Sequence, residues 1–272
     1  MKNLSSRVVS AVIALVVLFL AIYYGRENGI YVLILLTVAR GSFEVARLFF
    51  NSTYPTFSRW VLVVLSVAVF LVLSQQNFRS LSAIAVVFCF VFLASIGILL
   101  HRRFENTDRV LTYISKSCLG LIYTCFLPLS VAWLLQTNNG IEWFLCLLAV
   151  VLAGDIGAYI FGVNFGKTKL APSLSPNKSL QGALGGLLFS TIAATLFCFV
   201  LLNTPLYVFP LVGLIGGFLG QIGDFFESLL KRVSGVKDSG TIMPGHGGLL
   251  DRLDGVLLAA PLFYVAATYF SL

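Results

Sequence analysis

The chain has 272 residues, of which 58% are hydrophobic and only 11% are charged, and its formal net charge is +7. Soluble domains carry roughly 25% charged residues, so this composition excludes a soluble globular protein and a disordered chain. The sequence predicts an all-α, polytopic integral membrane protein. The basic residues stand singly between apolar runs, so membrane topology explains the positive charge and no nucleic-acid partner is expected.

Apolar segments in nine places approach the roughly 20 residues that a membrane-spanning helix needs. In chain order, the predicted spans are 8–24, 30–50, 60–75, 81–101, 113–136, 141–162, 180–202, 206–230 and 249–271. Arg40, Glu44 and Arg47 interrupt the second span at helical spacing, which places all three on one face. That face is expected to contact protein or water. Residues 1–140 are expected to form N-terminal transmembrane helices and 141–272 a transmembrane catalytic region, within one membrane domain.

Lys and Arg are distributed unevenly between alternate loops, and basic residues accumulate on the cytoplasmic side of membrane proteins. If the N-terminus is cytoplasmic, the segments on that side hold Lys2, Arg7, Arg59, Arg102, Arg103, Arg109, Lys167, Lys169, Lys178, Lys231, Arg232 and Lys237. The opposite loops hold only Arg26 and Arg79. The protein is therefore predicted to lie in the cytoplasmic (inner) membrane with a cytoplasmic N-terminus and an active site that faces the cytoplasm.

Acidic residues are concentrated in the C-terminal half of the chain. Residues 1–140 contain one aspartate, Asp108, whereas residues 150–255 contain Asp155, Asp224, Asp238, Asp251 and Asp254. An aspartate in the middle of a span costs on the order of 3 kcal/mol, so each requires a partner or a function. Asp224 and Glu227 share one helical face, as do Asp251 and Asp254, and such faces suit Mg²⁺. The alternative is structural ion pairing of Asp224 and Asp251 with Lys231 and Arg252.

The segment between these acidic faces combines cations with glycines. Lys231, Arg232 and Lys237 supply positive charge, and five glycines between residues 235 and 248 let backbone amides approach a bound group closely. This composition suits a polyphosphate, and with the flanking carboxylates it predicts a metal-assisted phosphoryl or nucleotidyl transfer site. His246 has two interpretations, as a donor to phosphate or as a packing residue of the tight loop.

From Ser228 to Asp254 the chain reads SLLKRVSGVKDSGTIMPGHGGLLDRLD, which resembles the signature of the phosphatidate cytidylyltransferases, also called CDP-diacylglycerol synthases. A second element, GDIGAY at 154–159 followed by FGK at 165–167 and SPNKSLQG at 175–182, is similar to another motif of that family. Here Asn177 and Gln181 replace the usual lysine and glutamate, and Val163 stands where an arginine is common.

The resemblance implies transfer of CMP from CTP to phosphatidic acid, giving CDP-diacylglycerol and pyrophosphate for phospholipid synthesis. It implies Mg²⁺ as the cofactor, leaves a second, monovalent cation open, and adds membrane lipids and a second copy of the chain, in a homodimer, as partners. Carried over residue by residue, it implies the catalytic residues Asp224, Asp251, Lys237, Asp238 and Arg252, the substrate-binding residues Lys178, Ser179, Lys231, His246 and Asp155, and the metal ligands Asp224, Asp251 and Asp254.

Two other functions fit parts of the pattern. Another CTP-dependent lipid-alcohol kinase or transferase shares some of this architecture, although the run PGHGGLLDRLD argues against it. An ion-coupled transporter would use intramembrane acids to bind its coupling cation, but transporters often carry internal repeats and none is visible in this sequence. Incubation with labelled CTP and phosphatidic acid would separate the three functions.

Overall fold

The computed structural model of the protein describes residues 2–236, 239–240 and 247–270. Its helices are α1 (Lys2–Phe49), α2 (Phe57–Leu73), α3 (Ser82–Leu99), α4 (Thr107–Leu121), α5 (Leu127–Leu134), α6 (Gly140–Phe165), α7 (Leu180–Leu196), α8 (Val208–Val233) and α9 (Leu250–Phe270). Short 3₁₀ turns lie at Gln76–Leu81, His101–Arg103 and Phe197–Phe199, and a π-helical turn lies at Ile122–Phe126. Within the described residues, the strands are β1 (Lys169–Ala171) and β2 (Ser175–Ser179). The predicted all-α membrane fold is confirmed.

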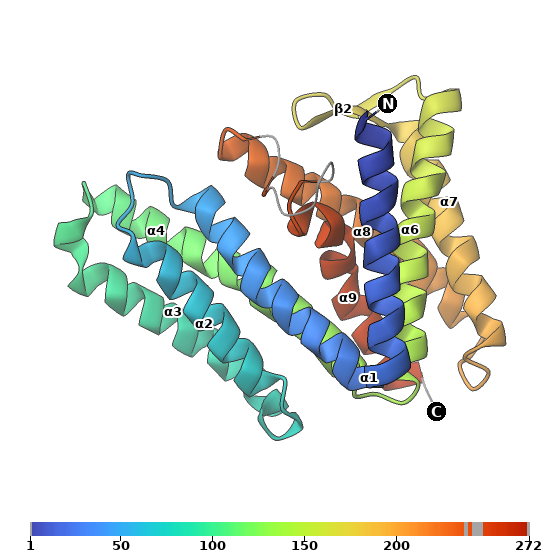
Figure 1. Cartoon of the computed structure of the whole chain (residues 1–272), viewed down its shortest axis with the longest axis horizontal. Helices are drawn as coiled ribbons and strands as arrows, with labels where there is room; N and C mark the ends of the chain where they lie inside the picture. Colours follow the sequence, from blue (N-terminus) through green and yellow to red (C-terminus); the bar gives the residue numbers. More distant parts are fainter. Residues whose placement is uncertain (1, 237–238, 241–246, 271–272) are drawn as a thin grey trace.

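Figure 1 shows two groups of helices with α8 and α9 between them. One group contains α2, α3 and α4 together with the second arm of α1, and the other contains α6 and α7 beside the first arm of α1. The start of α1 and the hairpin lie at the same end of the molecule, and α9 ends at the opposite end. The division into regions at residue 140 stays a prediction.

The helix α1 bends sharply at Arg26, whose backbone dihedral angles (φ 47°, ψ −129°) are not helical. The predicted spans 8–24 and 30–50 are the two arms on either side of this bend (Figure 1). Gly29 permits the bend, because a Cβ atom there would overlap the backbone carbonyl of Ala21. The bend sends the second arm, with Glu44, toward α9.

Among the described residues, seven helical segments are long and apolar enough to cross a membrane, and α2 is a shorter apolar helix. The predicted spans all coincide with helices, but α1 counts once because its two arms form one bent element. The 17 residues of α2 rise about 25 Å, less than the roughly 30 Å of a bilayer's hydrocarbon core. The count of nine and the cytoplasmic start therefore stay predictions.

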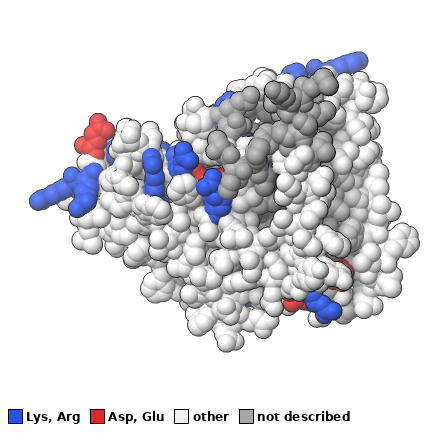
Figure 2. Space-filling view, viewed as in Figure 1, with Lys and Arg blue, Asp and Glu red and all other residues white. Residues whose placement is uncertain are grey.

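Charged side chains are unevenly placed on the face shown in Figure 2. They gather in the upper part of that view, with a small group at the lower right, and a broad uncharged surface lies between. Large apolar side chains on the helices are exposed, for example Phe88 and Leu99 of α3. Such a surface is stable against lipid and unfavourable against water.

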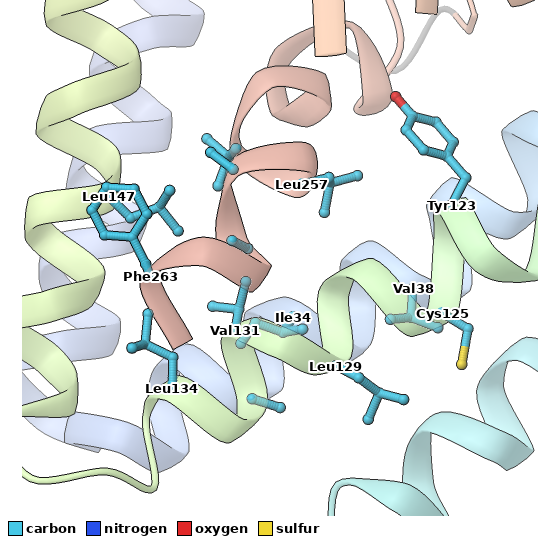
Figure 3. Close-up of a cluster of buried hydrophobic side chains, with 14 of the residues drawn as sticks. Ile34, Val38, Tyr123, Cys125, Leu129, Val131, Leu134, Leu147, Leu257 and Phe263 are labelled. Atoms are coloured by element: carbon cyan, nitrogen blue, oxygen red, sulfur yellow. The ribbon is translucent and has the colours of Figure 1, made fainter. Parts of the chain in front are cut away.

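The buried core joins the two groups of helices. Figure 3 shows Val38 of α1, Leu129 of α5, Leu147 of α6 and Phe263 of α9 among the buried apolar side chains of one cluster. The path from α4 to α5 passes through the π-helical turn, which lies just before Pro128. Proline has no N–H to donate to an α-helical partner, so the change of pitch falls where the helix already lacks a hydrogen bond.

Glycines bring α8 and α9 close together beneath the polar loops. Gly223 of α8 packs against the backbone carbonyl of Asp254, leaving no room for a Cβ atom. Three residues earlier in α8, Gly220 faces Gly255 of α9. Because the backbones approach this closely, Asp224 and Asp254 are brought to the same helix crossing.

Candidate active site

A cavity of about 520 Å³ lies between α6, β2, α7 and α8. Its polar lining includes Asp155 of α6, Lys178 and Ser179 of β2, and Asp224 of α8. Its apolar lining includes Tyr159 and Val163 of α6 and Leu170 of β1, all of which are exposed. The structure thus gathers four of the predicted site residues from three segments that are far apart in the sequence.

Lys178 and Asp224 form an ion pair across this cavity. The Lys178 Nζ atom lies 2.8 Å from Asp224 Oδ2 and 4.3 Å from the centre of the Phe225 ring, so a cation–π contact adds to the ion pair. Both side chains are about one third exposed (31% and 30%), which leaves the ammonium group accessible to a bound anion. The predicted alternative, in which Asp224 pairs with Lys231, is wrong.

The hairpin β1–β2 presents Lys178, in the connection that the sequence predicted between the spans 141–162 and 180–202. The strands pair antiparallel, with Lys169 opposite Ser179, and the Leu180 N–H donates to the Thr168 carbonyl at 2.9 Å. Ser179 also begins α7, because its side-chain oxygen accepts the Gly182 N–H at 3.2 Å. A helix N-terminus is electropositive, so this end of α7 favours an anion in the cavity.

The three residues that depart from the family pattern all have identifiable positions. Gln181 accepts hydrogen bonds from the Lys167 and Thr168 N–H groups, at 3.1 Å and 3.2 Å, and so holds the turn into β1. Asn177 and Val163 line the cavity. The loss of positive charge at these two lining positions leaves Lys178 as the cation among the cavity-lining residues that the structure describes.

A second charged cluster lies where α8 ends and α9 begins. The sequence predicts that this end of the two helices faces the cytoplasm. The Lys231 Nζ atom is 2.8 Å from Glu227 Oε2 and 2.5 Å from Asp251 Oδ1. The second oxygen of Asp251, Oδ2, accepts from the Ser239 N–H (3.0 Å), the Ser239 hydroxyl (2.8 Å) and the Gly248 N–H (2.7 Å). Asp251 therefore holds both Ser239 and Gly248 of the glycine-rich segment in place.

Asp254 is buried at the helix crossing, where Asp224 and Glu227 are its acidic neighbours. The Tyr123 hydroxyl and Glu227 Oε1 are buried and have no hydrogen-bond partner among the described residues. Asp224, Glu227, Asp251 and Asp254 are near enough to act electrostatically on Tyr123. Figure 3 shows the Tyr123 hydroxyl directed toward the C-terminal elements. Buried polar atoms are normally hydrogen-bonded, so these unpartnered oxygens mark hydrogen-bonding capacity that the described contacts leave unused.

The predicted metal ligands are not gathered around one point. Within the part of the chain that the structure describes, no three acidic, histidine or cysteine side chains meet in the geometry of a metal site. Asp224 and Asp254 lie together, whereas both oxygens of Asp251 are already occupied by Lys231, Ser239 and Gly248. Mg²⁺ needs only one or two protein carboxylates when substrate phosphates and water complete its shell, so the oxygen donors at the crossing fit this ion.

Other predicted residues lie elsewhere. Arg252 is exposed on α9 and is among the charges around Asp155. Lys237, Asp238 and His246 lie outside the described residues. The sequence interpretation assigned no role to Tyr123, Ser239 or Glu44. The charged residues that interrupt the second span could have pointed to Glu44. Nothing in the sequence around Tyr123 distinguished it from a core aromatic residue.

Together these features define a polytopic α-helical membrane protein with a mixed-charge cavity at the helix ends. A model of the cytidylyltransferase family matches residues 5–270, so the chain belongs to that family. It is 38% identical over 191 residues to the phosphatidate cytidylyltransferase of Staphylococcus haemolyticus, 70% of each chain. It is 40% identical over 163 residues to that of Staphylococcus saprophyticus, covering 57% of this chain and 63% of the relative. The corresponding protein of Staphylococcus aureus is 37% identical over 172 residues, with 63% and 64% covered. The resemblance read from the motifs is confirmed.

Proposed function

We propose that this protein transfers CMP from CTP to phosphatidic acid, giving CDP-diacylglycerol and pyrophosphate for phospholipid synthesis. The observation that carries the proposal is the cavity whose lining joins Lys178 and Asp224 to exposed apolar residues of α6. An enzyme that joins a nucleotide to a membrane lipid needs a charged surface for phosphates next to an apolar one for acyl chains. Family membership and the names of the relatives support the same reaction.

In the proposed reaction, a phosphate oxygen of phosphatidic acid attacks the α-phosphorus of CTP. The bond between that phosphorus and the oxygen bridging to the β-phosphate breaks, and pyrophosphate leaves. The lipid phosphate is already ionised near neutral pH, so no general base is required. Both reactants are polyanions, so cations must hold them together and stabilise the charge that develops on the leaving group.

We assign the phosphate contacts to the described cations at the cavity and its rim. Lys178 is held over the Phe225 ring by Asp224, and it can turn from this carboxylate to a substrate phosphate without leaving the cavity. Ser179 and the N-terminus of α7 add electropositive character, and Arg252 adds a further charge near Asp155. Lys231 pairs with both Asp251 and Glu227 and offsets part of their negative charge, which lowers their repulsion of nearby phosphates.

We propose Mg²⁺ as the cofactor, held by Asp224 and Asp254, with Glu227 beside them and Asp251 as the less accessible candidate ligand. When bound, Mg²⁺ would neutralise charge on the CTP phosphates and on the departing pyrophosphate. The support is the all-oxygen donor set and the unpartnered Glu227 oxygen. The cytoplasmic membrane, a cytoplasm-facing active site and a homodimer belong to the same proposal, supported by the basic loops and the family.

The test is an assay of the purified protein with labelled CTP, phosphatidic acid and Mg²⁺. We expect CDP-lipid and pyrophosphate in equal amounts. In a parallel reaction with a lipid alcohol in place of phosphatidic acid, formation of CDP and a phosphorylated lipid alcohol would identify a kinase instead. No consumption of CTP in either reaction would favour the transporter. Lys178→Ala should lower turnover on the order of 100-fold, as loss of one electrostatic contact to the reacting groups often does. Lys169→Ala, an exposed lysine on the neighbouring strand, is the matched control.

A further inference from the structure

Glu44 is a buried acid on the second arm of α1, far from the cavity in the sequence. Only 1% of its side chain is exposed. A carboxylate at such depth is expensive unless charge or hydrogen bonds compensate it. Within α1 it meets one partner, Arg40, whose Nε lies 3.1 Å from Glu44 Oε1.

The other contacts of Glu44 come from the segment before α9. Its Oε1 accepts the Leu249 N–H at 3.2 Å, and its Oε2 accepts the Leu250 N–H at 3.1 Å. Leu250 is the first residue of α9, so these are N–H groups that no residue within the helix can satisfy. Glu44 thus caps α9 from another helix, and its negative charge lies at the positive end of the α9 dipole.

The same carboxylate also contacts the glycine-rich segment. Glu44 Oε2 lies 3.3 Å from the Ser239 hydroxyl, which is also 2.8 Å from Asp251 Oδ2. Gly240 and Gly248 pack directly on the Glu44 carboxylate, since a Cβ atom at either position would approach its oxygens to 2.7 Å or 2.6 Å. Glu44 and Asp251 therefore enclose Ser239 from two sides, and the glycines are small enough to allow it.

We infer that Glu44 is a positioning residue for the signature motif: it fixes the start of α9 and Ser239, and thereby sets Asp251 in its working geometry. This inference rests on the proposed function for its kinetic consequence, but its structural consequence is independent of activity. The competing explanation is that Glu44 serves only as the partner of Arg40 within α1.

The test compares Glu44→Gln with Glu27→Gln, the same change at an exposed position on the same helix. The amide keeps the shape of the side chain but removes the charge and one acceptor oxygen. We expect the turnover number to fall at least tenfold, while the KM for phosphatidic acid stays within about twofold. Hydrogen exchange in a peptide covering residues 247–254 should accelerate, because one of the Leu249 and Leu250 N–H groups loses its acceptor and the other loses a charged one. Glu27→Gln should change neither measurement.

Arg40→Gln separates the two explanations, since it removes the ion pair and leaves the other contacts of Glu44. We expect it to retain most activity and near-normal exchange at 247–254; a loss equal to that of Glu44→Gln would overturn the inference. Unchanged exchange in Glu44→Gln would also overturn it, whatever the activity.

If Glu44→Gln does not fold, Ser239→Ala removes one of the contacts and should still raise exchange. A wild-type protein without cytidylyltransferase activity would defeat the proposed function while leaving the exchange result valid.

Discussion

The partners of the ionised side chains illustrate what residue spacing can and cannot predict. Asp224 and Lys231 are seven residues apart on α8, two helical turns or about 10.5 Å, whereas Glu227 is one turn from Lys231 and takes its ammonium group. Asp224 pairs instead with Lys178, 46 residues earlier, on a strand whose position depends on the fold. The sequence identified the charged residues of the site, but tertiary packing decided how they pair.

The burial of the two aspartates gives a first prediction. Asp251 is 8% exposed and neutralises Lys231, whereas Asp224 is 30% exposed. Both Asp251→Asn and Asp224→Asn should abolish turnover. Only the former should also destabilise the protein, by about 2 kcal/mol, since Lys231 loses one of its two carboxylate partners and the Ser239 and Gly248 N–H groups lose a charged acceptor. Thermal unfolding in detergent measures the difference, and Asp108→Asn, an exposed acid, is the control. Near-normal activity of either variant at limiting Mg²⁺ would remove that residue from the metal site.

Gln181 gives a second prediction at this scale. Its Oε1 accepts two backbone N–H groups, a role that a glutamate oxygen performs equally well. Gln181→Glu, which restores the residue usual in the family, should keep activity within about threefold of wild type, because an added charge strengthens both hydrogen bonds. Gln181→Leu should lose at least tenfold, since both N–H groups lose their acceptor. Equal activities of the two variants in the CTP assay would show that the turn does not matter.

At the scale of elements, the sequence predicted where helices occur better than how they bend or break. Each predicted span falls on a helix because long apolar runs leave the backbone no other way to satisfy its hydrogen bonds in lipid. The bend at Arg26, the π-helical turn and the hairpin were not predicted. Each depends on local backbone geometry or on contacts with distant segments, and neither leaves a hydrophobic period in the sequence.

The crossing of α8 and α9 gives a third prediction. Gly223→Ala would place a methyl group on the Asp254 carbonyl, forcing the helices apart, and should cost about 1–3 kcal/mol of stability together with most of the activity. Gly220→Ala is a closely matched control on the same face of α8, because its Cβ would meet the nearest atom at an ordinary 3.6 Å. Thermal unfolding and turnover of the two variants should differ clearly. Similar losses in both would mean that the close approach at Gly223 does not determine the effect, since helix propensity alone favours alanine at both positions.

At the scale of the whole molecule, the family and the general fold were predictable from the sequence, because the motifs are long and the composition is extreme. The composition of the site was predictable in part. The contact between α1 and the site was not predictable, since Glu44 and Ser239 are 195 residues apart and no local pattern relates them. The orientation in the membrane stays a prediction based on the basic loops.

That orientation gives a fourth prediction. Single cysteines at Ser173 and Val236, in a cysteine-free background, should resist a membrane-impermeant thiol reagent applied to intact cells. A cysteine at Asn203, in the segment between α7 and α8 that lies at the opposite end, should react with it. All three positions are exposed, so accessibility to solvent does not distinguish them. Reaction at Ser173 or Val236 from outside would overturn the cytoplasmic orientation of the site.

The contact between Glu44 and the start of α9 has a consequence for how the protein is made. The ribosome synthesises α1 before α9, so a membrane-inserting chain already carries the Glu44 carboxylate while the roughly 200 residues before Leu249 and Leu250 are still being made. Until then, Arg40 is the charge available to it on its own helix. A chain truncated before α9 would keep an incompletely compensated acid among its helices, with the free-energy cost that such a group carries in a membrane.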